Sequence, residues 1–363
     1  MFVAWKDLRF AKGRFALMGS VIVLITVLVG LVSGLTAGLG KDNTSAITGL
    51  PTDHLVFSAP AAGEDPSFTV SSVDEQTWKA WAQVPGITGA DPLGIVTTRA
   101  EAGERTASVS AFGIEPDSRL APSAGQIQGG TVVLSTGAAE DLHAEPGDSI
   151  ALAGQQLRVA AVSGDASYSH TPVIWTSLDD FQHLAGGPGD SLRNATVIAL
   201  TTSPEADLTA ADAALDTRTI SRDDALSAIG SFSSENGSLQ LMRGFLFAIS
   251  ALVIGAFFTV WTIQRSGDIA VLKALGASTR YLLRDALGQA VVLLVLGTAA
   301  GTAIAAGVGA AIGASGAGVP FVLDLTTVAF PALIMIALGA AGAALSVRRI
   351  NSVDPLTALG SAR

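Results

Sequence analysis

The sequence has no cysteine and few residues of the other types that usually carry out chemistry. Without cysteine the chain has neither a disulfide framework nor a thiolate metal site. Its four histidines, His54, His143, His170 and His183, are widely spaced. The zinc-protease pattern H-E-x-x-H, the hydrolase pattern G-x-S-x-G and the phosphate-binding loop G-x-x-x-x-G-K-[ST] do not occur. We therefore expect no catalytic residues, no metal site, no intrinsic cofactor and no ATP hydrolysis by this chain.

Charged residues are also scarce, at 14% of the chain against 49% apolar residues, a composition typical of membrane proteins. The apolar residues gather in four runs, 15–39, 241–263, 282–311 and 321–347, each long enough to cross about 30 Å of hydrocarbon as a helix. The first run is much longer than the apolar core of a signal peptide, which has about 7–15 residues. We expect it to be a retained span.

Near the two ends of the chain and around the loop between the second and third runs, eleven Lys and Arg residues stand against four acids. Acids dominate residues 41–236 instead, and they give the chain its formal net charge of −10 at pH 7. Because an excess of Lys and Arg marks cytoplasmic loops, both termini and the 264–284 loop are expected in the cytoplasm and residues 41–236 outside the cell. The acidic segment argues against nucleic acid as a partner.

Residues 41–236 show short β-branched and aromatic runs that alternate with helical stretches begun by Ser, Thr or Asp caps. The stretch 146–159 is typical of a hairpin in a small β-barrel. The fold class expected is therefore an α-helical membrane protein with four transmembrane helices and a mixed α/β extracellular domain inserted between helices 1 and 2. Its parts are 1–40 (an interfacial helix and the first span), 41–236 (the extracellular domain) and 237–363 (three spans, the cytoplasmic loop 264–284 and a C-terminal tail).

The loop 264–284 has the sequence Q-R-S-G-D-I-A-V-L-K-A-L-G-A-S-T-R-Y-L-L-R. Ile269, Leu272 and Leu275 recur at helical spacing as one apolar stripe, and Gly276 is expected to end the helix. This pattern predicts a short amphipathic helix at the membrane surface. The alternative is a positively charged loop that only fixes the topology.

This loop resembles the one after the second span in FtsX-like (MacB-type) ABC permeases, where R-x-x-E-I-x-x-L-[RK]-A-L-G-A-S recurs. Residues 272–278, L-K-A-L-G-A-S, fit that pattern, and Asp268 keeps the charge where the family more often has Glu. The layout of spans and the D-P and A-L pairs of the tail resemble the same family. The resemblance implies a homodimer of this chain with two copies of a separate cytoplasmic ATPase, which binds the ATP. The residues that it assigns to ATPase coupling are Asp268, Leu272, Lys273, Leu275 and Gly276.

Three further stretches resemble the haem-exporter permeases of Gram-positive bacteria. They are M-F-V-A-W-K-D-L at 1–8, S-G-L-T-A-G-L at 33–39 and G-D-A-S-Y-S-H-T-P-V at 164–173. This resemblance implies export of haem or a similar lipophilic amphipath. An iron porphyrin needs an apolar slot, an axial donor and small residues against its flat face. The candidate cargo-binding residues are Glu235, Tyr168, His170, Phe232, Gly30 and Gly34.

A plainer role is also open for these residues. Gly30 and Gly34 lie on a small-xxx-small ridge that serves helix packing equally well. Glu235 fits a solvated acid in a polar linker, while Tyr168 and His170 fit structural residues of a loop.

We expect this chain to be the permease subunit of an ABC-type efflux pump in the plasma membrane, in contact with membrane lipid. The pump would detoxify the cell by exporting haem. The alternative is a mechanotransmitter that moves no cargo and couples a cytoplasmic ATPase to an extracellular cell-wall hydrolase. The pump needs an apolar cavity with a donor in the outer leaflet. The mechanotransmitter needs only a partner-binding face on residues 41–236.

Overall fold

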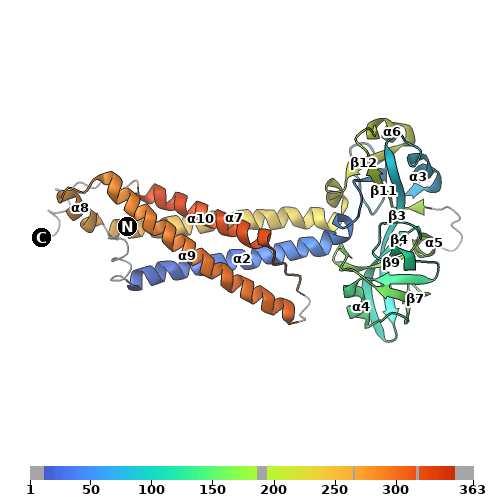
Figure 1. Cartoon of the computed structure of the whole chain (residues 1–363), viewed down its shortest axis with the longest axis horizontal. Coiled ribbons are helices and arrows are strands. Elements are labelled where there is room, and N and C mark those ends of the chain that lie inside the picture. The colour runs from blue at the N-terminus through green and yellow to red at the C-terminus, as the bar shows by residue number, and fades with distance from the viewer. Residues whose placement is uncertain (1–11, 186–193, 265, 316–318, 348–363) are drawn as a thin grey trace. The chain divides into compact units, whose positions relative to one another are not determined.

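The computed structural model describes residues 12–185, 194–264, 266–315 and 319–347. They form two compact units (Figure 1). The α/β unit takes Leu39–Gly237, and the helix unit takes the residues up to Gly38 and from Ser238 onward. The interfacial helix expected before the first span and the tail pattern lie outside the described residues.

Long helices dominate the chain on either side of the α/β unit. They are α2 (Lys12–Thr48), α7 (Gly230–Gln264), α9 (Thr279–Ala314) and α10 (Leu325–Val347), with the short α8 (Ser266–Ala274) between α7 and α9. In the described part of the chain, four helices are long and apolar enough to cross a membrane. The expected fold class, four spans with an α/β domain between the first and second, is confirmed.

The fourth span begins later than its apolar run predicts. Residues 321–347 form one apolar run, but α10 begins only at Leu325. The Asp324 carboxylate accepts a hydrogen bond from the Thr327 N–H (2.6 Å), and the Asp324 N–H donates to the Thr327 hydroxyl (2.9 Å). This reciprocal cap fixes the N-terminus of α10 and leaves Phe321 outside the helix.

Glycine lets the helices of the helix unit approach one another closely. A Cβ atom at Gly297 of α9 would lie 2.7 Å from Ile22 Cγ2 of α2, and one at Gly301 would lie 2.7 Å from Thr26 Cβ. Carbon atoms in ordinary contact are about 3.5–4.0 Å apart, so these positions admit no side chain. The G-x-x-x-G spacing of Gly297 and Gly301 thus lets α9 pack closely against α2.

The α/β unit is built on a ten-stranded mixed sheet in the order β12-β1-β11-β3-β4-β9-β5-β7-β6, with β8 paired to β9. Its strands are β1 (His54–Ser58), β3 (Ile87–Ala102), β4 (Arg105–Ile114), β5 (Thr131–Leu134), β6 (Ser149–Leu152), β7 (Gln155–Val162), β8 (Ser167–Tyr168), β9 (Thr171–Ser177), β11 (Val197–Thr202) and β12 (Thr217–Ser221). The remaining elements are the pair β2 (Val73–Asp74) and β10 (Asn194–Ala195), helices α3 (Glu75–Trp81), α4 (Thr136–Leu142), α5 (Leu178–Ala185) and α6 (Leu208–Leu215), and the 3₁₀ turns η1 (Ala124–Gln126) and η2 (Asp224–Ala228).

Part of this sheet closes on itself as a small barrel. The long β3 pairs with β4 along its length and, at Ala100 and Glu101, also with β6. The path β3-β4-β9-β5-β7-β6 therefore returns to β3. The β6–β7 hairpin turns at Ala153 and Gly154, whose φ angles of 47° and 87° are those of a type I′ turn. The predicted barrel hairpin at 146–159 is confirmed.

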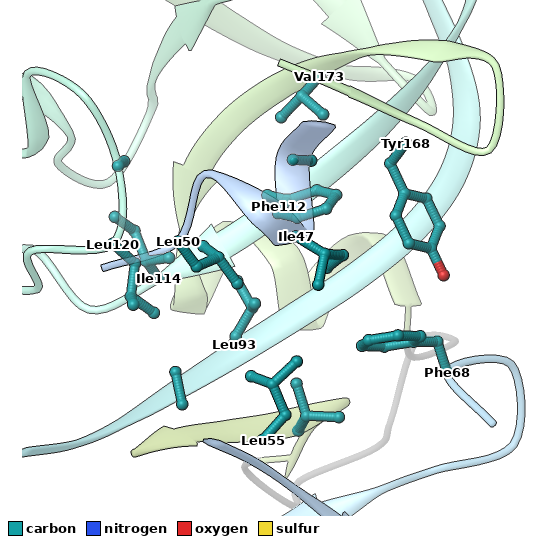
Figure 2. Packing of buried hydrophobic residues seen from close by; sticks show 14 of the residues in the cluster. Ile47, Leu50, Leu55, Phe68, Leu93, Phe112, Ile114, Leu120, Tyr168 and Val173 are labelled. Carbon is teal, nitrogen blue, oxygen red and sulfur yellow. The ribbon is translucent and has the colours of Figure 1, made fainter. Parts of the chain in front are cut away.

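The end of α2 and the residues directly after it belong to the core of the α/β unit. Ile47 and Leu50 are almost fully buried. Figure 2 shows them beside Phe112 and Ile114 of β4. This burial fixes the helix end that carries Asp42 and Asn43, about one turn before Ile47.

Candidate functional site

The β8–β9 hairpin turns at Ser169 and His170, with Tyr168 paired to Thr171. Both turn residues have positive φ (50° and 62°), as a type I′ turn requires. Neither is glycine or asparagine, so each holds a backbone conformation that L-residues seldom adopt. The turn places the His170 imidazole beside side chains of α2 and α7.

The imidazole of His170 lies between two carboxylates from different helices. Its Nδ1 is 3.1 Å from Asp42 Oδ2 at the end of α2, and its Nε2 is 2.9 Å from Glu235 Oε2 in the first turns of α7. The two acids face opposite edges of the ring, so they do not converge on one point as metal ligands would. The described residues hold no group of three or more His, Cys, Asp or Glu placed to bind a metal ion.

Asn43 offers Nε2 of His170 a second partner. Asn43 Oδ1 accepts a hydrogen bond from Ser231 (2.9 Å), which directs the amide Nδ2 to His170 Nε2 at 3.0 Å. A protonated Nε2 donates to Glu235, whereas an unprotonated Nε2 accepts from Asn43. The ring therefore has a partner for Nε2 in either protonation state.

Protonation of His170 is favoured in the folded protein. Burial lowers its pKa, but the hydrogen bonds to Glu235 and Asp42 outweigh burial, and the pKa lies above the usual value for histidine. When it is protonated, the ring donates to both carboxylates at once. It thus ties the β8–β9 turn to the end of α2 and the start of α7.

Further bonds join the same three segments. Ser169 donates its backbone N–H to Asn43 O (3.0 Å), and its hydroxyl lies 2.9 Å from that of Ser231. Lys41 pairs with Asp165 at 2.6 Å. His170 and Glu235, far apart in the sequence, are thus held together in the α/β unit.

Tyr168 lies in the core, apart from this cluster's polar groups. It is 7% exposed, and its ring meets those of Phe68 and Phe112 edge-to-face at centroid distances of 5.8 and 5.6 Å. Figure 2 shows the three rings together. Burial raises the pKa of Tyr168 well above its usual range. Of the two roles open to Tyr168, the packing favours the structural one.

Phe232 and Glu235 differ in their surroundings although both lie on α7. Phe232 packs, half-buried, against the core of the α/β unit. The Glu235 side chain is 46% exposed and bonded to His170. Glu235 is therefore a surface carboxylate with a fixed partner rather than a freely solvated acid.

The glycine ridge of α2 is covered by other parts of the same chain. A Cβ atom at Gly30 would lie 2.8 Å from Ala305 Cβ of α9, and one at Gly34 would lie 2.4 Å from Cζ of Phe321. The Phe321 ring also lies against Gly309 of α9, and the Val322 N–H donates to Gly34 O (3.1 Å). In this structure the ridge serves intramolecular packing, which was the plainer of its two expected roles.

A small cavity remains beside the ridge, between α2, α9 and α10. It measures about 10 Å³ and is lined in part by Thr26, Gly30, Thr302 and Pro331. That volume is about the least that holds one water molecule. It is far too small for a porphyrin.

The helix predicted in the 264–284 loop is α8, but its apolar residues do not form one outward stripe. Ile269 and Ala270 are 8% and 1% exposed and pack within the helix unit. Leu272 is half-buried against the same cluster, whereas Val271 (48%) and Leu275 (79%) face outward. The single stripe is therefore wrong, because Ile269 and Leu272 are taken up by the unit's own core.

The ends of α8 follow the sequence closely. Gly276 has φ +94°, and the Ala277 N–H donates to Leu272 O (2.9 Å), which closes the helix as a left-handed cap. Ser278 then caps α9 by accepting from the Tyr281 N–H (3.3 Å). The predicted stop at Gly276 is confirmed. The Asp268 side chain lies outside the described residues, and Lys273 is in the last turn of α8.

Two families match the chain in adjoining parts. Residues 15–218 match the MacB-like periplasmic core domain, and residues 241–355 match the C-terminal region of FtsX-like permeases.

Relatives match over the full length. The putative hemin transport system permease protein HrtB of Staphylococcus epidermidis is 23% identical over 365 residues, covering 99% of both chains. The protein of the same name in Staphylococcus haemolyticus is 23% identical over 372 residues with equal coverage. An uncharacterised ABC transporter permease of Mycobacterium tuberculosis is 23% identical over 369 residues, again covering 99% of both.

Among solved structures, the periplasmic region of MacB from Actinobacillus actinomycetemcomitans matches with a TM-score of 0.37 and 15% identity. This match covers 51% of this chain and 95% of that one. The extracellular domain of the transporter YknZ from Gram-positive bacteria matches with a TM-score of 0.35 and 13% identity, over 47% and 98% of the two chains.

Proposed function

Since the chain belongs to the FtsX-like and MacB-like family of ABC permeases, we propose that it is the membrane subunit of an efflux pump that exports haem or a similar flat, lipophilic amphipath. It works as a homodimer with two copies of a cytoplasmic ATPase. The α/β unit lies outside the cell, and both termini lie in the cytoplasm.

The cargo is proposed from the relatives. The staphylococcal permeases that match over 99% of both chains are named as putative hemin transporters. The equally similar mycobacterial permeases have no cargo in their names. Binding experiments on this chain therefore decide the question.

The observation that carries the pump proposal is the construction of α8. Permeases of this family normally work with a cytoplasmic ATPase. Leu275, 79% exposed, and Val271 stand out from a helix whose opposite side is packed into the helix unit. An apolar pair in such a place gives a partner protein a surface to bury.

Force on α8 has a direct path to the spans. Ile269 and Ala270 anchor α8 by burial, and the buried cluster around Ile269 includes Trp261 of α7 and Leu282 of α9. The caps at Gly276 and Ser278 join α8 to α9 without a flexible linker. Movement of the ATPase is therefore passed to the end of α7 and the start of α9.

Glu235 is the donor that we propose for the cargo. Its carboxylate is 46% exposed and bonded to His170, which holds it at a defined place on the α/β unit. A carboxylate is an acceptable axial ligand for ferric haem. His170 acts as its positioning partner, and Phe232 contributes an apolar neighbour on the same helix.

Titration of the purified full-length chain with hemin in lipid nanodiscs tests the cargo. We expect saturable binding with a shifted Soret band. Glu235→Gln is expected to change the spectrum and weaken binding, while Glu64→Gln, an exposed acid elsewhere in the α/β unit, leaves both unchanged. Absence of saturable hemin binding by the wild type would reject haem and favour the mechanotransmitter.

A further inference from the structure

Arg243 is the one charged residue that the sequence places between Glu235 and the end of α7 at Gln264. Its side chain is half-buried in the helix unit. Its Nε atom is buried, and within the described residues that atom has no hydrogen-bond partner. A buried donor without an acceptor costs free energy, and a guanidinium stays charged at any physiological pH.

Among the described side chains of the helix unit, no acid pairs with Arg243. Two acids of this unit have described side chains, Asp285 and Asp324. Asp285 accepts a hydrogen bond from Gln289 in the first turns of α9 (3.0 Å). Asp324 is used by the α10 cap, where it accepts from Thr326 and Thr327. The described acids of the unit therefore leave Arg243 without a counter-ion, and a bound anion would supply one.

The position of Arg243 along α7 indicates at which level of the membrane that anion lies. At 1.5 Å per residue, Arg243 is about 31 Å from Gln264, and the hydrocarbon core of a membrane is about 30 Å thick. With the polar end of α7 at one face of this layer, Arg243 lies at the opposite boundary. An arginine at this boundary can place its charge among the polar headgroups while its stem lies along the apolar layer.

We propose that Arg243 binds a carboxylate of the cargo at the outer boundary of the membrane. The proposal rests on the pump function above. An amphipath in the outer leaflet keeps its apolar body among the lipid chains and its charged edge at this boundary. Haem is built in this way, with a flat apolar ring and two propionates on one edge. Once the Arg243 side chain turns to expose Nε, that atom and a neighbouring Nη form the fork that takes both oxygens of a carboxylate, and this satisfies the donor that lacks a partner.

A lipid phosphate is the other source of an oxyanion at that depth. The two sources differ in what they predict for cargo binding. If Arg243 binds a lipid, masking the carboxylates of the cargo changes the affinity of the cargo by the same factor with or without Arg243. If Arg243 holds the cargo, that effect depends on Arg243.

The test compares hemin with hemin dimethyl ester, in which both propionates are esterified, on the full-length protein in nanodiscs of zwitterionic lipid. The wild type is expected to bind hemin about tenfold more tightly than the ester, as for a charge-assisted pair. Arg243→Gln is expected to weaken hemin about tenfold and to leave the ester unchanged, so that the preference disappears. Arg243→Lys, which keeps the charge but loses the fork, is expected to lie between them. Arg280→Gln, which removes an exposed charge at the start of α9, should keep the wild-type preference.

Three results would overturn the inference. A preference for hemin that survives in Arg243→Gln overturns it and leaves the pump function standing. Bound phosphatidylglycerol can be followed by native mass spectrometry in nanodiscs that contain this lipid. If Arg243→Gln keeps the preference for hemin but loses this bound lipid, Arg243 binds a lipid headgroup. A wild type that binds neither porphyrin overturns the haem function, and the carboxylate assignment falls with it.

Discussion

The insertion of Phe321 between α2 and α9 gives a sharp test of the helix unit. The ring lies between two glycines. A Cβ atom at Gly34 would be 2.4 Å from Phe321 Cζ, and one at Gly309 would be 2.2 Å from Phe321 Cε1. Gly34→Ala therefore forces the ring to withdraw by about 1 Å to reach ordinary contact. The backbone of α9 at Gly309 blocks withdrawal on the other side.

The cost follows from this geometry. Overpacking of a fitted site costs about 1–3 kcal/mol. The sandwich between two helix backbones puts Gly34→Ala in the upper half of that range. In a Phe321→Ala background the clash is absent, and the alanine then gains about 1 kcal/mol of helix propensity over glycine. We therefore expect a coupling free energy of about 2 kcal/mol or more between the two positions.

A double-mutant cycle in detergent, unfolded with SDS and followed by far-ultraviolet circular dichroism, measures this coupling. Gly19→Ala is the control, since it lies on the same helix with nothing within 4 Å of the new Cβ. The control should be neutral or stabilising in both backgrounds. If Gly34→Ala behaves like Gly19→Ala in the wild-type background, Phe321 does not occupy the ridge.

Further predictions concern docking, topology and pH. Leu275→Asp places a charge on the exposed side of α8 and should abolish co-purification with the ATPase without unfolding the chain. Ile269→Asp, at a buried site, should instead reduce the amount of folded protein. Normal ATPase recovery with Leu275→Asp would contradict the docking assignment. A cysteine at Ser123 in the α/β unit should react with an impermeant maleimide in intact cells, and one at Ser278 should not; the reverse labelling would invert the topology. The pKa of His170 is raised in the folded state, so protonated His170 stabilises the folded protein. This contribution is complete below the ordinary histidine pKa of about 6.5 and is lost as the pH rises through the raised pKa. His170→Gln should therefore remove part of the stability difference between about pH 6 and pH 9, which His183→Gln should retain; an unchanged difference in His170→Gln would show that the ring does not carry it.

Much of the fold could be predicted because it depends on local patterns. Apolar runs of membrane length identify the four spans, and the barrel hairpin is visible from its turn and its alternating strands. The ends of α8 are equally local, since Gly276 supplies the left-handed cap and Ser278 begins the next helix. Each of these features needs only neighbouring residues.

Features that depend on distant contacts could not be predicted. Nothing local shows that Ile269 and Leu272 are covered by the unit's own core while Leu275 is not. Phe321 reads as the first residue of a span, because its insertion at Gly34 depends on a helix near the other end of the chain. These errors share one cause, which is that an apolar residue does not indicate which surface will bury it.

The candidate site shows the same division. Glu235 and His170 were identified by their chemistry, but their bond depends on the fold of the α/β unit. Asp42 and Asn43 carry no sequence signal beyond being polar residues near a helix end. Arg243 does carry one, as a lone charge within an apolar run, and its missing partner becomes visible only in the structure.

We propose that this chain uses ATP, through its partner ATPase, to move haem out of a membrane. The most direct measurement reconstitutes the chain with its ATPase in hemin-loaded vesicles and follows the transfer of hemin to an external acceptor protein. We expect transfer that requires ATP and that is lost in Leu275→Asp. ATP hydrolysis by the assembled complex with no transfer of hemin above the ATP-free rate would contradict the claim.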